Sequence, residues 1–466
     1  MNIMNIVKQA YSSWNDKLSP ESSKVAHIAW PVLVEVLLSS LFSMVDMMML
    51  GNIPGKELAN QSVAAVGIVN QPLYVGIALI QSLNVGGTAM IARYLGAKQN
   101  DRIEQSFKHV ILLSFTLLTI PTFLICQMFT SQIMVLLGAE TAVVTLGVPY
   151  FRLIMTGFLF SSFSFSFTAA LRGAGETRTP MRINLIANFA NVIGNAVLIY
   201  GLFGLPALGI VGAGISTAVS NVLAFILLLR HVLSGKSQIT LKLRNKFRFS
   251  KDTIYNLVKI GVPASGEQLV MRAGVMIFVR IVAGLGTTVF AAHQIALSIL
   301  ALSFNPGMAF GIASASLVGF SLGNKEPDMA EKYSRSARHM GSIVSTGIAV
   351  VFFALAPQLA GLFNKDPEVI RNAVLALRII ALIQPFQSSQ LILAGALRGA
   401  GDTFWTLIAT IAGVLVIRIG LGLLFVNYLG WGIVGAWSAV LVDQLIRWVI
   451  VYGRFRGGKW KHIVIR

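Results

Sequence analysis

The octapeptide ALRGAGET at residues 170–177 recurs as ALRGAGDT at residues 396–403. A long apolar stretch precedes each copy, and another apolar stretch follows it. Gly-x-Gly motifs also cradle phosphates, but in such sites the motif follows a β-strand. Here the preceding stretch has the length of a membrane-spanning helix, so the motif predicts a tight turn between two helices. The chain contains this turn twice.

Other repeats surround the two turns in the same order. LGAK at 95–98 recurs as LGNK at 322–325, and GIVGA at 209–213 recurs at 432–436. Pro31 with Glu35 recurs as Pro263 with Glu267. All these offsets are close to half of the chain, which indicates two similar halves. We predict an N-terminal cytoplasmic or interfacial segment 1–24, a first lobe 25–230, a basic cytoplasmic linker 231–252, a second lobe 253–453 and a basic cytoplasmic tail 454–466.

The composition indicates a membrane protein. Hydrophobic residues make up 55% of 466 positions and charged residues only 12%, whereas a soluble domain has roughly 25% charged residues. Apolar runs of about 20 residues, long enough to cross a bilayer, recur along the chain. We predict an all-α integral membrane protein of twelve transmembrane helices, in two six-helix lobes related by a pseudo-twofold axis along the membrane normal. The expected spans are 25–50, 62–90, 107–129, 144–170, 180–202, 208–230, 253–283, 287–318, 339–362, 370–396, 403–427 and 432–453.

The distribution of basic residues predicts the orientation. The formal net charge is +19, but Lys and Arg lie in short segments between apolar runs, which argues against a nucleic-acid partner. Nearly all these segments fall on one side of the predicted spans, together with the 231–252 linker. By the positive-inside rule, both termini and the linker are expected in the cytoplasm. The predicted location is the cell membrane, with multiple passes.

Ionisable groups inside a bilayer cost at least ~2.5–3.5 kcal/mol on insertion scales, so each one calls for a reason. The first span carries Glu35 and Asp46, eleven residues or about three turns apart, and therefore on one helix face. The fifth span carries four asparagines at spacings of 4, 3 and 4, also on one face: Asn184, Asn188, Asn191 and Asn195. The amides either fix helix packing or line a wet cavity.

Because the first and fifth spans run in the same direction, Asn191 and Asn195 are expected at the same depth as Asp46. A carboxylate beside amide oxygens suits a proton, or a Na⁺ ion. We predict a cation-coupling site formed by Asp46, Asn191 and Asn195, with Glu35 on the same face. Among metal ions, Na⁺ is the alternative to a proton at Asp46, Asn191 and Asn195.

A second group of polar residues predicts an adaptable cavity for amphipathic substrates. Its members are Glu267, Asn70, Gln71, Tyr74, Asn184, Asn188, Gln384 and Gln387. The sequence gives no role for Arg272, Arg280, Arg378 and Arg418. No Ser/His/Asp arrangement, nucleotide-binding loop or metal-ligand spacing is found in the sequence. We therefore expect neither catalytic residues nor a cofactor, and an ion gradient as the energy source.

The paired turn motif, the first span from Pro31 through Asp46, and Asn191 with Asn195 together resemble the multidrug and toxic compound extrusion (MATE) family. The likeness extends from about residue 25 to 453, and looks closest to the bacterial DNA-damage-inducible F branch. The resemblance implies cation-coupled export of cationic or amphipathic small molecules, by a monomer without a cofactor. Its first-span carboxylate corresponds to Asp46. Its fifth-span Asn-x-x-x-Asp corresponds to Asn191 and Asn195, where this chain has Asn in place of Asp, which favours H⁺ over Na⁺.

Two other functions remain open at this point. One is a flippase for lipid-linked precursors from the same superfamily, which would have a strongly cationic cavity. The other is a channel or a membrane-embedded interaction protein, which paired repeats with buried carboxylates fit less well.

Overall fold

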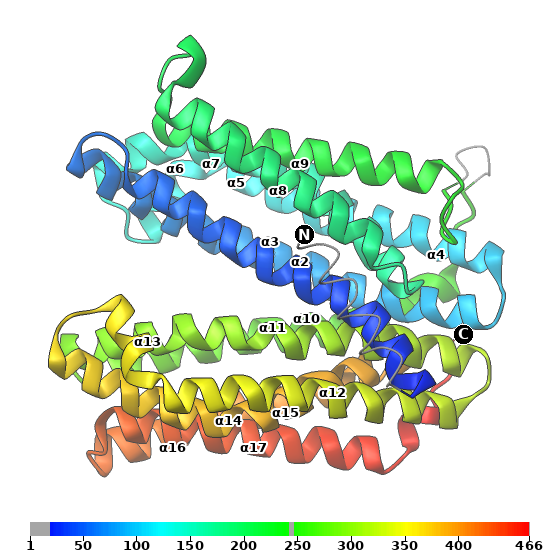
Figure 1. Ribbon diagram of the computed structural model, residues 1–466. Helices are drawn as coiled ribbons and strands as arrows, with labels where there is room; N and C mark the ends of the chain where they lie inside the picture. Colours follow the sequence, from blue (N-terminus) through cyan, green and yellow to red (C-terminus); the bar gives the residue numbers. More distant parts are fainter. Residues whose placement is uncertain (1–18, 242–246, 466) are drawn as a thin grey trace, which may run out of the picture. The chain divides into compact units, whose positions relative to one another are not determined.

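The computed structural model describes residues 19–241 and 247–465, and these residues form long helices (Figure 1). The first half contains α2 (Pro20–Gly51), α3 (Lys56–Gly96), α4 (Asn100–Leu113), η1 (Ser114–Thr119), α5 (Ile120–Met128), α6 (Thr130–Leu136), α7 (Thr141–Gly173), α8 (Arg178–Tyr200), η2 (Leu202–Gly204) and α9 (Gly209–Leu233). The second half contains α10 (Lys251–Ala283), α11 (Thr287–Gly323), α12 (Pro327–Ala354), α13 (Ala356–Phe363), α14 (Pro367–Ala400), α15 (Thr403–Thr410), η3 (Ile411–Arg418), α16 (Ile419–Leu423), η4 (Leu424–Tyr428), α17 (Gly432–Arg456) and η5 (Lys459–His462).

The helices agree with the predicted membrane spans. Within the described residues, eleven helical segments are long and apolar enough to cross a bilayer. The segment that is not among them is α10, which carries Glu267, Arg272 and Arg280. The third span consists of α4, η1 and α5 in one run, and the eleventh of α15, η3, α16 and η4. Both runs contain π-helical turns, η1 in the third and η3 and η4 in the eleventh. The predicted all-α membrane fold is confirmed.

Both octapeptides form the predicted turn. After α7, Gly175 has φ 77°, and after α14, Gly401 has φ 86°, a left-handed conformation that glycine adopts without a steric penalty. Each turn is closed by a backbone hydrogen bond spanning six residues, as in a Schellman motif. The N–H of Glu176 donates to Leu171 at 2.9 Å, and that of Asp402 donates to Leu397 at 2.7 Å. The sequence repeat is therefore also a repeat of backbone geometry.

The described chain separates into two compact units. One consists of Val34–Leu269 and the residues from Val464, and the other of the residues up to Leu33 and Val270–Ile463. Two helices, α2 and α10, each contribute to both units. The units therefore differ from the predicted lobes 25–230 and 253–453 in these two helices, because the units follow contacts and the lobes follow chain order. We call the unit containing Val34–Leu269 the first unit and the other the second unit.

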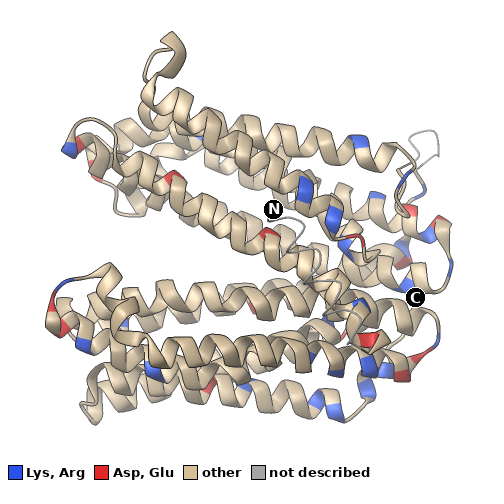
Figure 2. Cartoon of the chain, viewed as in Figure 1, with Lys and Arg blue, Asp and Glu red and all other residues tan. Residues whose placement is uncertain are grey.

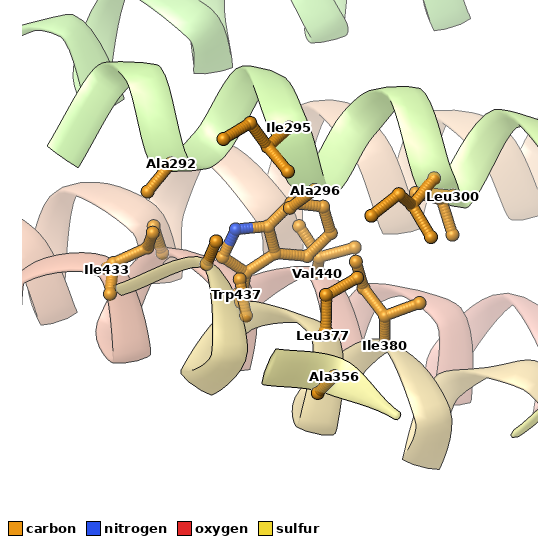
Figure 3. Close-up of a cluster of buried hydrophobic side chains, with 14 of the residues drawn as sticks. Ala292, Ile295, Ala296, Leu300, Ala356, Leu377, Ile380, Ile433, Trp437 and Val440 are labelled. Carbon is orange, nitrogen blue, oxygen red and sulfur yellow. The ribbon is translucent and has the colours of Figure 1, made fainter. Parts of the chain in front are cut away.

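Each unit has its own apolar core. In the second unit, the indole of Trp437 on α17 is fully buried among side chains of α11 and α14, including Ala296, Leu377 and Ile380 (Figure 3). The N-terminal part of α2 packs in the same unit, where Val25 and Ala29 belong to one cluster with residues of α11 and α12. In the first unit, Met155 and Phe158 of α7 are buried.

Small residues let α11 and α14 approach closely. A Cβ atom built on Gly395 would lie 2.2 Å from the carbonyl oxygen of Gly311, and one built on Gly399 would lie 2.2 Å from that of Ala315. Backbone atoms line the contact, so no side chain can move away to make room. This small-xxx-small pairing is typical of helices that associate in membranes.

Gly395→Ala is therefore expected to lower the free energy of unfolding by about 1–3 kcal/mol, the usual cost of overpacking. Gly347→Ala is the matched control, because Gly347 lies inside α12 with open space around a built Cβ. The control is expected to keep or slightly raise stability, since Ala favours a helix by about 1 kcal/mol over Gly. Thermal unfolding in detergent measures both, and equal midpoints for the two variants would contradict the prediction.

The basic residues follow the pattern predicted from the sequence. Within each unit, most Lys and Arg lie at one end of the helices, where α3 ends and α4 begins or where α11 ends and α12 begins (Figure 2). A charged band at one end of each unit fits one face of a bilayer.

Candidate functional site

The asparagines of α8 lie on one face, as the spacing predicts, and the structure turns this face toward α2. Three of its amide groups donate to side chains of α2: Asn184 to Glu35 Oε1 (2.6 Å), Asn188 to Ser39 Oγ (3.1 Å) and Asn195 to Asp46 Oδ1 (2.8 Å). Each pair is separated by 149 residues in the sequence. The constant separation means that the two helices run parallel and in register. The stripe therefore joins α8 to the part of α2 that belongs to the first unit.

Asp46 lies at the C-terminal end of this row along α2. Its carboxylate is half-buried and accepts from Asn195, whose own side chain is only 1% exposed. The Oδ1 atom of Asn195 is buried without a hydrogen-bond partner. A buried oxygen without a donor is unfavourable by about 1–3 kcal/mol.

The amide of Asn191 is satisfied when its nitrogen is turned toward Asp46. The nitrogen then donates to both carboxylate oxygens of Asp46, at 3.2 and 3.1 Å, and the amide oxygen accepts from the N–H and the hydroxyl of Thr217, both at 3.2 Å. The hydroxyl of Ser216 donates to the backbone carbonyl of Asn191 at 2.8 Å. This orientation matches the amide donors to acceptors and suits an ionised Asp46.

Ser216 and Thr217 of α9 were missed in the sequence. Serine and threonine occur throughout membrane helices, where their hydroxyl groups bond to a carbonyl of the preceding turn, so they give no signal of their own. Gly194 of α8 is part of the reason why α9 packs so closely against α8. A Cβ built on it would lie 2.4 Å from Ser216 Oγ. Tyr150 of α7, which is buried and within electrostatic reach of Asp46, was missed in the same way.

Glu35 has a different environment from Asp46. Its carboxylate is 5% exposed and forms an ion pair with Arg172 at 2.9 Å, in addition to the bond from Asn184. Arg172 belongs to the repeated octapeptide, at the end of α7. The guanidinium neutralises Glu35 in this conformation, whereas Asp46 has amide neighbours. The two carboxylates predicted on one helix face are therefore on one face, but in unlike electrostatic surroundings.

The residues predicted to line a cavity lie in several places. On α3, Asn70 is half-buried, whereas Gln71 and Tyr74 are exposed. On α14, Gln384 and Gln387 are almost fully buried, and Gln384 donates to Ser303 of α11 at 2.7 Å. Glu267 of α10 is also buried. The contacts bring together Asp46, Asn191 and Asn195, and separately Glu35 and Asn184.

The second unit contains a buried ion pair of its own. Arg418, at the end of the π-helical segment η3, donates through Nε to Asp443 of α17 at 3.0 Å. Asp443 is fully buried. Gly413 allows this approach, since a built Cβ would lie 2.2 Å from Asp443 Oδ1. Arg418, which had no role in the sequence analysis, is thus one partner of an interior ion pair.

Among the residues that the structure describes, no group of three or more His, Cys, Asp or Glu side chains could hold a metal ion. The polar side chains around Asp46 are the amides of Asn191 and Asn195, with Thr217 beside Asn191.

The MatE family model matches residues 31–197 and 263–424, more than half of the chain. An uncharacterized transporter, YisQ of Bacillus subtilis, is 26% identical over 434 residues, which cover 93% of this chain and 94% of that protein. A probable multidrug resistance protein, NorM of Thermotoga maritima, is 28% identical over 455 residues, or 95% and 94% of the two chains.

Solved structures have the same fold. An outward-facing multidrug resistance MATE family transporter of the MOP superfamily superposes with a TM-score of 0.86 at 22% identity, over 95% of this chain and 97% of that one. A MATE transporter in the straight conformation gives 0.85 over 95% and 97%, at 22% identity. These findings confirm the predicted fold and the expectation of a transporter rather than an enzyme. The chain belongs to the MatE family, the multidrug and toxic compound extrusion transporters.

Proposed function

We propose that this chain is a cation-coupled antiporter that exports amphipathic or cationic small molecules across the cell membrane by alternating access of two lobes, with Asp46 as the coupling carboxylate. The relatives named as multidrug resistance proteins support the substrate class. The contact that carries the proposal is the one between Asp46 and Asn195. It puts a half-buried carboxylate against a buried amide of another helix.

The neighbours of Asp46 can serve both an ionised and a cation-bound carboxyl group. When Asp46 is ionised, Asn191 and Asn195 both donate to it. An amide also carries an oxygen that accepts from a protonated carboxyl group or contacts a cation. Rotation of one amide would therefore accompany loading of the site.

A proton is the favoured coupling ion. Tight Na⁺ binding generally uses several charged or carbonyl oxygens, and this site has one carboxylate, two amides and two hydroxyl groups. Na⁺ remains the alternative, at Asp46, Asn191 and Asn195. Glu35 would take part in coupling only after Arg172 releases it.

The remaining parts of the proposal concern the substrate path and the orientation. Glu267, Asn70, Gln71, Tyr74, Asn184, Asn188, Gln384 and Gln387 are proposed to contact substrate at stages of the cycle. Buried amides such as Gln384 would become accessible when the lobes rearrange. Both termini are proposed to face the cytoplasm, in keeping with the basic band in each unit, and a monomer is proposed to be sufficient.

Purified protein in sealed vesicles tests the proposal directly. Vesicles loaded with a fluorescent cationic dye receive an inward proton gradient, an inward sodium gradient, or neither. Proton-driven dye release that saturates with dye concentration is the expected result. Release that follows only the sodium gradient would reassign the ion, and equal release in all three conditions would contradict coupled transport.

A further inference from the structure

His109 has contacts that fix which of its ring nitrogens carries hydrogen. The side chain lies on α4 and is fully buried. Its Nδ1 lies 2.8 Å from the carbonyl oxygen of Gln105. The backbone N–H of Ser250 donates to Nε2 at 3.1 Å. A carbonyl oxygen only accepts and an N–H only donates, so Nδ1 carries the hydrogen and Nε2 is bare. This environment therefore suits a neutral ring.

The N–H that His109 accepts belongs to the residue just before α10. Ser250 also caps that helix, since its Oγ accepts from the N–H of Thr253 at 3.3 Å and from its hydroxyl at 3.0 Å. The rings of Phe247 and Phe249 lie against the imidazole, with centroids 4.8 and 6.0 Å away. We call residues 247–250 the linker end. His109 is thus the polar anchor of the linker end on α4.

The helix that begins here is packed tightly into the first unit. Leu257 and Ile260 are buried in one core with residues of α3 and α4. The hydroxyl groups of Ser265 and Ser82 of α3 are 2.5 Å apart. From Val270 onward, α10 belongs to the second unit. The linker end therefore holds the first turn of a helix shared by both units.

The charged groups on the neighbouring elements leave the ring of His109 without an ion pair. On α4, Glu104 and Lys108 pair with each other at 2.8 Å. On α3 the nearest titratable side chains along the helix are Arg93 and Tyr94, and around the start of α10 they are Arg248, Lys251 and Asp252. Among the described residues, the contacts of His109 are with Gln105, Ser250 and the two phenylalanine rings. Protonation would thus gain no counter-ion there.

We propose that His109 is a proton-sensitive anchor, which holds the linker end and the first turn of α10 when neutral and releases them when protonated. Protonated Nε2 carries a hydrogen and points it at the N–H of Ser250, so one attraction becomes a repulsion between two donors. Free histidine titrates near pH 6.5, within the range that acidification of a cell reaches. The link to transport rests on the proposed function, in which the linker faces the cytoplasm and each cycle brings a cation inward.

At the other described end of the linker, acidification is expected to strengthen the attachment rather than loosen it. Glu176 accepts from Ser237 at 2.6 Å and from Thr179 at 2.6 Å, and it pairs with His231 at 2.7 Å. Burial alone would raise the pKa of Glu176, but these hydrogen bonds and the charge of His231 bring the pKa below its ordinary value. Protonating His231 strengthens its pair with the ionised Glu176. Acidification is therefore expected to loosen the linker end at His109 and keep the attachment at Ser237.

Hydrogen exchange of the full-length protein in detergent tests the anchor without any transport assay. The readout is exchange in the peptides covering residues 247–256, at pH 7.5 and 5.5, corrected for the intrinsic pH dependence of exchange. In the wild type, the Ser250 amide is expected to exchange at least about tenfold faster at pH 5.5 than this correction predicts. Unchanged protection at the lower pH would overturn the proposal.

Two variants separate titration from packing. His109→Gln keeps an acceptor but does not titrate, so its protection is expected to be independent of pH. His109→Phe removes the acceptor and is expected to exchange fast at both values. A pH response in His109→Gln equal to that of the wild type would assign the effect to another group, and would also overturn the proposal.

Dye counterflow at equal pH on both sides then connects the anchor to transport. The pH on both sides is lowered from 7.5 to 5.5, and the factor by which the dye counterflow rate changes is measured. This factor is expected to be at least about twofold larger for the wild type than for His109→Gln. An exchange response without any dye transport would contradict the proposed function and leave the anchor standing. Dye transport without a pH response in hydrogen exchange would contradict the anchor and leave the proposed function standing.

Discussion

Asp46→Asn is expected to reduce proton-driven dye export by at least about tenfold, the equivalent of 1.4 kcal/mol in the coupled step. Asparagine is close in shape to aspartate and still offers an oxygen to the amide of Asn195, which lies 2.8 Å from the carboxylate. It cannot bind and release a proton. The variant should therefore fold and insert normally, and lose the response to the gradient. Dye release from vesicles under an imposed pH gradient measures the change.

Ser39→Ala is the matched control for Asp46→Asn. Ser39 lies on the same face of α2 and accepts from Asn188 at 3.1 Å, so the variant also alters one contact between α2 and α8. It removes no ionisable group, and its export rate is expected to stay within about twofold of wild type, since one neutral hydrogen bond contributes about 1 kcal/mol. Wild-type export by Asp46→Asn would remove Asp46 from the mechanism. Equal losses in both variants would mean that the asparagine row serves packing alone.

Arg418→Met is expected to lower the free energy of unfolding by about 3–5 kcal/mol, the cost of leaving one member of a buried ion pair alone. Asp443 is fully buried, and Arg418 is its ion-pair partner among the described residues. Without the guanidinium, a carboxylate would remain in the interior of the second unit. The thermal midpoint in detergent, and the fraction of protein that elutes as a single species, measure the effect.

The double variant Arg418→Met with Asp443→Leu is expected to recover part of the lost stability, because both members of this ion pair are removed together, while the buried Arg447 one turn away stays. Arg335→Ala serves as the surface control. Arg335 also pairs with an acid, Glu331, but its side chain is 69% exposed, so the expected change is below about 1 kcal/mol. A midpoint for Arg418→Met no lower than that for Arg335→Ala would show that the interior pair has no role in stability.

The octapeptide repeat is the clearest case of a structure that the sequence predicts. A left-handed residue is needed where one helix stops and another begins, and glycine supplies it at Gly175 and Gly401. The same local origin applies to the asparagine stripe. Spacings of 4, 3 and 4 fix a common direction on any α-helix, whatever surrounds it, so a single row of asparagines could be predicted. The depth match of Asp46 with Asn195 followed from helix length and direction.

The sequence by itself determined the helices, the doubled turn and the face of its helix on which each polar residue lies. Only the tertiary structure decided the partners that come from other helices: Arg172 for Glu35, Thr217 for Asn191, Asp443 for Arg418, and Ser250 for His109. The physical reason is that periodicity fixes a direction around one helix axis, while a contact between helices depends on how far each slides and rotates against its neighbour. That adjustment is set by glycines such as Gly194 and Gly413, which show their effect only when two helices are packed together.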